Sequence, residues 1–334
     1  MNKPVTIKDI AREVGVGNTA VSAVLGHSPS SHVRVSEATR ARILEAARVM
    51  KYRRNGLARS FRNQRTDVLG VYTTQGYLSP HVVFSSQIIG GLHRGCYEHS
   101  KDLLLHSITS TRPAEEVYAE LGDGRVDGLV LYASPRDPVV RLLADSTLPV
   151  VAIVDAITGL PSVVADDDGG SRQLAAYLAS KGHLRVLYIT GPDTLVSAAR
   201  RRQGFWEAAA ALGLEVTEFQ PTIHHERLTE VDLEWLDQPR TERPTAVVCW
   251  NDMTAYNLLE RCHQRGLRIP EDIAVAGFDG LPLSQPTQWR LTTLRAPWVE
   301  VAGAAIDLLM RRINGEEVPL ETILPVEFIL GETA

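Results

Sequence analysis

The stretch Val5-Thr-Ile-Lys-Asp-Ile-Ala-Arg-Glu-Val-Gly-Val16 decides the fold of the N-terminal part of the chain. Its apolar residues at positions 7, 10, 11 and 14 repeat at the spacing of one helix face. Thr6 is a good N-cap, and Asp9 three residues later completes an approximate capping box. Gly15 ends the helix because glycine adopts a positive φ at little cost. The stretch therefore predicts a short amphipathic helix that stops at a tight turn.

Two further short helices are expected after this turn. The second runs from about Gly17 to Leu25, and the third follows Ser36, another capping residue. The small core that they share is expected to contain Ala20, Val21, Val24, Leu25, Ile43, Leu44, Ala47 and Met50. The short side chains of Asn18, Thr19, Ser22 and Ala23 then face away from this core, where they can approach base edges. A helix, a glycine turn and a second helix form a helix-turn-helix, which places its second helix in the major groove of DNA.

Charge is divided unevenly along the chain. Residues 1–66 contain thirteen Lys and Arg and four Asp and Glu, a net charge of +9, whereas the whole chain carries −5. The other residues therefore carry −14. A small basic head on an acidic body suits a module that binds a polyanion, joined to a body that repels it. Charge alone is equally compatible with a solvated basic face.

The composition limits the class of protein. A chain of 334 residues that is 44% hydrophobic and 22% charged is long enough for two or three globular domains. Cys96, Cys249 and Cys262 are too widely spaced for a metal motif and are typical of reduced thiols. No apolar run reaches the roughly 20 residues that span a bilayer, and residues 1–16 lack the apolar core of a signal peptide. We therefore expect a cytoplasmic protein with no membrane partner, no metal and no cofactor.

From Arg65 onward the pattern changes to strands that alternate with helices. Apolar runs such as Val68–Tyr72 and Ala246–Trp250 predict buried strands, and segments such as Phe84–His99 and Asp252–Arg265 predict helices. This alternation indicates parallel, doubly wound sheets. About 270 residues are too many for one such sheet, so we expect two lobes.

Ligands of doubly wound sheets bind beyond the carboxyl ends of the strands. The polar and aromatic residues at these ends, with one glycine, are Thr73, Thr74, Ser107, Asp155, Gly191, Trp250, Asn251, Asp252 and Asp279. Carboxylates accept hydrogen bonds from paired hydroxyls and an indole covers apolar C–H groups, so this set fits a polyhydroxylated ligand. Other roles are open as well: Asp279 as a turn residue, Asp252 as a helix N-cap and Trp250 as a core residue.

The head resembles the DNA-binding domain of the lactose-repressor (LacI/GalR) family. The resemblance is carried by residues 5–16, by Thr19-Ala-Val-Ser22 and by Val35-Ser-Glu-Ala-Thr-Arg40, and Asn55-Gly-Leu-Ala-Arg-Ser-Phe-Arg62 resembles the family's hinge. It implies a hinge helix that folds on operator DNA, pairs with its dimer mate and inserts an apolar side chain into the minor groove. Phe61 stands where leucine is usual, and Ala23 where many members carry arginine. The implied DNA-binding residues, with Asn18 and Thr19 as the specificity readers, are Thr6, Gly17, Asn18, Thr19, Ser22, Ala23, His27, Arg34, Tyr52, Asn55, Ala58, Arg59 and Phe61.

The body resembles the periplasmic-binding-protein-like effector domain of the same family. The matching strings are Asp166-Asp167, Gly182-His183, Arg201-Arg-Gln-Gly-Phe205, Asn251-Asp252, Gly277-Phe-Asp279 and Leu291-Thr-Thr293, so the resemblance covers nearly all of the chain. It implies that Arg201 and Asp279 grip polar groups of the effector. The other effector-binding residues expected are Thr73, Phe84, Asp155, Trp250 and Asn251. A sugar or sugar derivative is the effector that the family suggests, and a nucleobase or another metabolite is the alternative.

These patterns together predict an all-α helix-turn-helix head and an α/β periplasmic-binding-protein-like body of two doubly wound parallel-sheet lobes. We expect the DNA-binding domain at residues 1–53, the hinge helix and linker at 54–65, and the effector-binding and dimerisation domain at 66–334. Lobe 1 would comprise residues 66–164 and 294–325, and lobe 2 residues 165–293 and 326–334. The predicted function is that of a homodimeric repressor of palindromic double-stranded operator DNA, controlled by a small metabolite.

Two other classes of protein fit less of the sequence. A solute-binding protein or sensor with the same two-lobed fold would explain the body but not the basic head. An enzyme would need a nucleophile–base pair or a metal cluster, and only Asp166-Asp167-Asp168 and His224-His225 resemble one. Adjacent carboxylates are usually turn and cap residues, and the two histidines lack partners at ligand spacing. We therefore expect no enzymatic activity.

Overall fold

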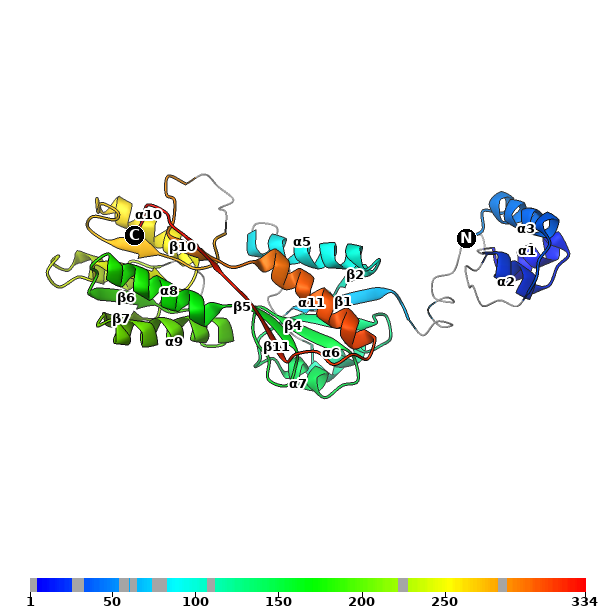
Figure 1. The fold of residues 1–334 in the computed structure, drawn as a ribbon, viewed down its shortest axis with the longest axis horizontal. Coiled ribbons are helices and arrows are strands. Elements are labelled where there is room, and N and C mark those ends of the chain that lie inside the picture. The colour runs from blue at the N-terminus through cyan, green and yellow to red at the C-terminus, as the bar shows by residue number, and fades with distance from the viewer. Residues whose placement is uncertain are drawn as a thin grey trace. The chain divides into compact units, whose positions relative to one another are not determined.

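The computed structural model describes residues 5–25, 33–53, 60, 65–73, 83–106, 112–221, 228–281 and 287–334. The chain divides into two compact units, residues 1–66 and 67–334. The first unit is all-α and the second is α/β (Figure 1), so the predicted fold class is confirmed. No helix within these ranges is both long and apolar enough to cross a lipid bilayer.

The first unit is a small head of three helices, α1 (Ile7–Val14), α2 (Asn18–Leu25) and α3 (Glu37–Val49). Asp9 Oδ2 accepts hydrogen bonds from N and Oγ1 of Thr6 at 2.9 and 2.6 Å, and Gly15 ends α1 with a φ of 72°. The buried core consists of Ile10, Ala11, Val14, Val21, Val24 and Ile43. Leu44 was expected in this core but is 47% exposed, because Ile43 is the residue of α3 that turns inward.

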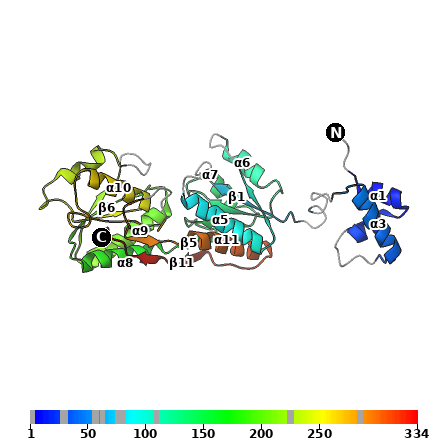
Figure 2. The ribbon, with the colours of Figure 1, turned by 90° about the horizontal axis from the view of Figure 1, so that it is seen from above.

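The second unit begins with a six-stranded parallel sheet in the order β11-β5-β4-β3-β1-β2, which we call lobe 1 together with its helices. Helices α5 (Val83–Glu98) and α11 (Trp298–Ile313) cover one face, and α6 (Ala114–Leu121) and α7 (Pro138–Ala144) cover the other (Figure 2). Side chains alternate along each strand, so that the two faces bury different residues. The strands are β1 (Val68–Thr73), β2 (Asp102–Leu105), β3 (Gly128–Tyr132), β4 (Val150–Ile153), β5 (Ser162–Ala165) and β11 (Glu321–Leu324).

A second parallel sheet, in the order β7-β6-β8-β9, forms lobe 2 with its helices. Helices α8 (Asp167–Ser180) and α9 (Val196–Ala211) pack on one face. Helix α10 (Asp252–Gln264) and the 3-10 helix η1 (Val231–Asp237) pack on the other. The strands are β6 (Arg185–Ile189), β7 (Glu215–Phe219), β8 (Ala246–Cys249) and β9 (Ala274–Ala276).

The chain passes back and forth between the lobes near its C-terminus. Strand β10 (Thr293–Arg295) leads into α11 and β11 of lobe 1, and the chain then returns as β12 (Glu327–Ile329), antiparallel to β10. Isolated bridges join Thr292 to Ala276 and Arg295 to Asp279, so β10 lies against the β9 edge of the lobe 2 sheet. The connection from β10 to α11 is therefore attached to lobe 2 at one end and to lobe 1 at the other.

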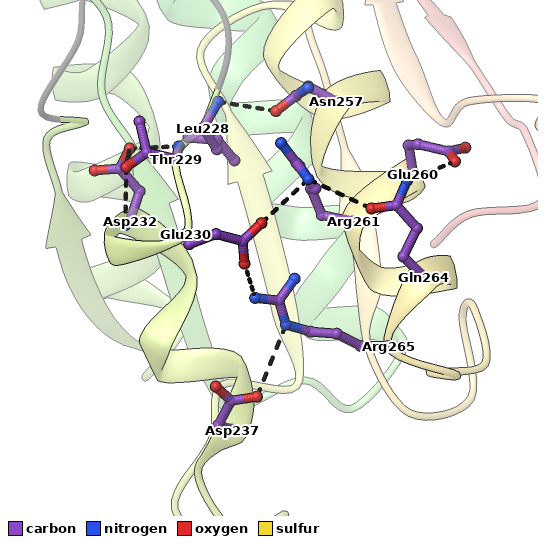
Figure 3. Close-up of polar contacts among 10 residues, drawn as sticks. All are labelled: Leu228, Thr229, Glu230, Asp232, Asp237, Asn257, Glu260, Arg261, Gln264 and Arg265. Atoms are coloured by element: carbon purple, nitrogen blue, oxygen red, sulfur yellow. Dashed lines mark hydrogen bonds and ion pairs between the residues drawn. The ribbon is translucent and has the colours of Figure 1, made fainter.

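Polar contacts fasten residues 228–237 to α10 (Figure 3). Glu230 pairs with Arg261 at 3.2 Å and with Arg265 at 2.6 Å, and Asn257 Oδ1 accepts a hydrogen bond from Leu228 N at 2.8 Å. Glu230 is 67% exposed, so each ion pair contributes roughly 1 kcal/mol or less. The contacts thus fix the path of this segment more than they stabilise it. His224 and His225, considered above as a possible cluster, lie outside the described residues.

The close packing of α5 on α11 makes Gly91 intolerant of a side chain. A Cβ at Gly91 would lie 2.4 Å from Val299 O and 2.7 Å from the Cβ of Ala302, whereas a Cβ at Gly90 would meet nothing within 4 Å. We expect Gly91→Ala to lower the free energy of unfolding by about 1–3 kcal/mol. Gly90→Ala, the matched control, should raise it by up to about 1 kcal/mol because alanine favours the helix. Urea unfolding of both variants measures the difference, and equal stabilities would contradict the close contact.

Candidate functional site

The buried guanidinium of Arg201 is the centre of a polar cluster in lobe 2. Arg201 lies on α9, and its side chain is 3% exposed. Its Nε donates to Asp167 Oδ1 at 2.7 Å, its Nη1 donates to the carbonyl of Trp250 at 2.8 Å, and its Nη2 lies 3.1 Å from Asp279 Oδ1. The guanidinium carbon lies 3.7 Å from the centre of the Phe278 ring, a cation–π contact. These contacts bring α8, α9 and the ends of β8 and β9 to one point.

Asp279 connects this cluster to the strand that leaves lobe 2. Its φ of 117° lies in the left-handed region, which aspartate enters more readily than most residues. Asp279 N donates to Leu294 O at 2.8 Å, and Ala296 N donates to Asp279 O at 3.1 Å. Its side chain is 12% exposed, so Asp279 is the more accessible of the two carboxylates that pair with Arg201. Its main chain therefore fixes β10, and its side chain fixes Arg201.

Asp252 does not have the N-cap role that was considered for it, because Asn251 has that role. Asn251 Oδ1 accepts from Thr254 N at 2.9 Å and caps α10, so Asp252 is not the N-cap. Asp252 accepts instead from Thr293 Oγ1 at 2.5 Å and from Leu281 N at 3.0 Å. Both residues are buried. Asp252 therefore shapes the loop that follows Asp279, while the Asn251 oxygen binds the end of its own helix.

Asp155 links the two lobes. It follows β4 of lobe 1, and its Oδ1 accepts a hydrogen bond from Ser197 N of α9 at 2.8 Å. Ser197 lies one helical turn before Arg201. A second hydrogen bond, from Ser134 Oγ to Thr194 O at 3.2 Å, also joins the lobes. The predicted residues Asp155, Arg201 and Asp279 are thus brought into one neighbourhood.

Four carboxylates, those of Asp155, Asp167, Asp252 and Asp279, interact around Arg201. Burial raises the pKa of Asp167 to about 6 even though Arg201 lowers it. Burial also raises the pKa of Asp155 and places that of Asp252 well above its usual range. Burial alone would lower the pKa of Arg201, but Asp279 and Asp167 more than offset this and raise it. A raised pKa favours the protonated form of a carboxyl group, so the cluster offers a polar ligand carboxyl O–H donors as well as oxygen acceptors.

Aromatic side chains lie together at the carboxyl end of the lobe 1 sheet. Phe84 of α5 packs edge-on against Trp298 with ring centroids 5.0 Å apart, and against Tyr132 at 5.6 Å. Thr73, the last residue of β1, is opposite Tyr132 in the strand register. The predicted residues Thr73 and Phe84 therefore belong to one group. Trp298 and Tyr132 were not predicted, and Trp250 of lobe 2 is half-buried rather than fully in the core.

The head presents part of the predicted DNA-binding set. Gly17, Asn18 and Thr19 at the start of α2 are exposed, as are Thr6 and Arg34. Ser22, Ala23 and Tyr52 are half-buried. His27, Asn55, Ala58, Arg59 and Phe61 lie outside the described residues, so their roles stay predictions.

Asp167 is the residue of the Arg201 cluster that pairs with the guanidinium and that sequence reasoning missed. In the acidic run at 166–168, Asp166 caps α8 through Gly169 N, and Asp168 pairs with Arg172. Asp167 alone turns inward. Its position was visible in the helical spacing, since Ser171, Leu174, Ala175 and Leu178 lie on the same buried face of α8.

The raised pKa of Asp167 makes stability depend on pH. The folded state keeps this proton up to about pH 6 while the unfolded chain releases it near the ordinary value of 3.8, so the contribution of Asp167 to stability falls as the pH rises through that range. We expect the free energy of unfolding, relative to Asp167→Asn, to fall by about 1–1.5 kcal/mol between about pH 5 and pH 7. Urea unfolding at both pH values measures this. Asp168→Asn is the exposed control, and a difference that does not change with pH would mean that Asp167 is ionised throughout.

Comparison with known proteins places this site in a family. The model for bacterial regulatory proteins of the lacI family matches residues 6–55, and the model for the periplasmic binding protein-like domain matches residues 175–334. The HTH-type transcriptional repressor PurR of Vibrio cholerae serotype O1 (strain M66-2) is 30% identical over 327 residues, covering 93% of this chain and 92% of that protein. PurR of Photobacterium profundum is 30% identical over 320 residues, covering 92% of each.

Solved structures agree with these matches. The complex of the transcriptional regulator CelR with cellobiose has a TM-score of 0.71 at 27% identity, over 99% of this chain and 100% of that one. The lac repressor dimer bound to operator and the anti-inducer ONPF has a TM-score of 0.82 at 22% identity over 99% of both chains, which shows a shared fold. The chain therefore belongs to the lacI family of bacterial regulatory proteins, and it is a DNA-binding transcriptional regulator with a periplasmic-binding-protein-like domain.

Proposed function

We propose that this chain, as a homodimer, represses transcription from a palindromic operator under the control of a small polyhydroxylated effector, a sugar or sugar derivative, bound at the Arg201 cluster. The observation that carries the proposal is that Arg201 and Asp279 of lobe 2 lie beside Asp155, which is hydrogen-bonded across the lobes. A molecule held by these groups would touch the contacts that set the lobe arrangement.

The chemistry of the cluster favours hydroxyl donors. Buried carboxylates accept hydrogen bonds from pairs of hydroxyl groups, and the rings of Phe84 and Trp250 offer apolar faces to C–H groups. The likeness to the cellobiose complex of CelR supports a carbohydrate. A nucleobase or another metabolite is the alternative effector, and the effector experiment must distinguish it from a sugar.

We propose the predicted division of labour along the chain: DNA-binding domain at 1–53, hinge and linker at 54–65, and effector-binding and dimerisation domain at 66–334. Asn18 and Thr19, exposed at the start of α2, would read base edges, and Phe61 would act as the wedge in the minor groove. The effector changes operator affinity only through its different affinity for the two lobe arrangements, typically by about 1–3 kcal/mol.

Selection of duplexes from random DNA by the full chain tests the DNA-binding half of the proposal. We expect a palindrome with a flexible pyrimidine–purine or CpG step at its centre. Thr19→Ala should relax the preference at one symmetric pair of positions, at a cost of about 1–3 kcal/mol. Arg34→Ala, the control, should weaken binding to all sequences alike. No enrichment at low salt, with or without sugars present, would contradict the proposal.

Thermal unfolding with a panel of mono- and disaccharides, cellobiose among them, and nucleobases tests the effector half. We expect at least one sugar to raise the melting temperature, because a ligand at a hundred times its Kd adds about 2.7 kcal/mol of stability. Asp279→Asn should abolish the shift, since the amide replaces a carboxylate that pairs with Arg201. Arg202→Ala is the control, because Arg202 is 52% exposed and pairs with Glu218. Stabilisation by nucleobases alone would favour the alternative effector.

A further inference from the structure

The residue before Asp155 has an unusual main-chain conformation. Val154 has a φ of 72°, and Asp155 N donates to Ile153 O at 2.9 Å. A hydrogen bond between residues two apart, with a positive φ at the residue between them, defines a classic γ-turn, which is rare and strained. A β-branched residue such as valine is a genuine outlier in this region. Glycine would adopt the same φ at little cost.

The structure around Val154 holds the turn in place from both sides. On one side, Val154 N donates to Val163 O at 3.1 Å, which extends the pairing of β4 with β5 by one hydrogen bond. On the other side, Asp155 Oδ1 is bound by Ser197 N of lobe 2. The Val154 side chain is 9% exposed and packs in the main apolar core. The turn therefore redirects the chain from a fixed strand so that Asp155 meets the other lobe.

The amide that Asp155 binds has no intrahelical acceptor. Ser197 is the second residue of α9, and the first hydrogen bond within that helix runs from Ala199 N to Leu195 O. The first amides of a helix need partners outside it, and a carboxylate at this position is also favoured by the helix dipole. Exchange of the Ser197 amide with solvent thus reports whether the bond between the lobes is made.

We propose that Val154 is a positioning residue whose strained γ-turn is held by the hydrogen bond between Asp155 and Ser197, so that the strain is released when the lobes part. Valine at this position lowers the stability of the bridged arrangement, in which Asp155 binds Ser197, relative to the separated arrangement, in which the lobes have parted and this bond is broken. The lobes therefore separate more readily than they would with an unstrained turn. Only the link from this separation to control of DNA binding rests on the proposed function.

Hydrogen exchange of the Ser197 amide in the full chain tests the proposal, with Val154→Gly as the main variant. Glycine removes the strain as well as the side chain, whereas Val154→Ala removes most of the side chain and keeps the unfavourable φ. We expect the Ser197 amide to be protected about tenfold more in Val154→Gly than in Val154→Ala. Asp155→Ala gives the unprotected limit. The amide of Ala199, bonded within α9, and the melting temperature of each variant report fraying and global stability separately.

Equal protection in the glycine and alanine variants, or less protection in the glycine variant, would overturn the proposal, because the turn would then hold no strain that the bridge opposes. Should Val154→Gly fail to fold, Val154→Asn replaces it, since asparagine tolerates a positive φ. The Ser197 amide must then be more protected in Val154→Asn than in Val154→Ala. The readout needs neither an effector nor an operator. It can therefore succeed if the proposed function fails, and fail if that function holds.

Discussion

The buried guanidinium of Arg201 is the interaction on which the body of this protein depends. Removing a charge from water costs several kcal/mol, and only close partners with good geometry offset that cost. Here each of the three guanidinium nitrogens has a partner: Asp167, Asp279 and the carbonyl of Trp250. Without Arg201, carboxylates would remain buried with no counter-charge, a loss of roughly 3–5 kcal/mol. The same group that makes the site polar therefore holds α8, α9 and two strand ends together.

Hydrogen bonds connect this cluster directly to the segments that join the two lobes. Asp279 binds Arg201 with its side chain and Leu294 and Ala296 with its main chain, directly before the chain crosses to α11. Asp155 reaches the same helix, α9, from the opposite lobe. A change in the contacts of Asp279 therefore changes the hydrogen bonds that hold β10. A change in the lobe arrangement changes the hydrogen bond of Asp155 with Ser197. Under the proposed function, these hydrogen bonds connect the effector site with the elements that join the lobes.

The sequence predicted most of the fold because the patterns that specify it are local. The helices of the head follow from apolar spacing, Thr6 and Gly15, and the lobes follow from strands that alternate with helices. Helices α7 and α11 and strands β5, β7, β10 and β11 were not recognised. α11 buries residues on much of its surface, so it lacks a clear polar face, and β7 is an edge strand with a largely exposed pattern. Strand order, and the return of β12 to pair with β10, depend on contacts far apart in the chain and have no local signal.

The site was likewise predictable in its residue types but not in its bonds. Strand ends pointed to Asp155 and Asp279, whereas Arg201 came from the resemblance alone, because an arginine in mid-helix has no distinctive local pattern. Asp167 was hidden within a run of three acids, two of which do serve the ordinary roles of cap and surface ion pair.

Each lobe contributes a main-chain conformation that is unfavourable by itself. Val154 of lobe 1 and Asp279 of lobe 2 both have a positive φ, and each adjoins or carries a carboxylate of the Arg201 cluster. Strained dihedrals and carboxylates with a raised pKa persist only where the surrounding structure over-determines them, and they gather at functional sites. Glycine at 154 would adopt the positive φ without strain, although it would lose the packing of the valine side chain in the core. Under the proposal made for Val154, the region where Asp155 meets α9 is less stable than its packing would allow, which is the property that an element with two arrangements requires.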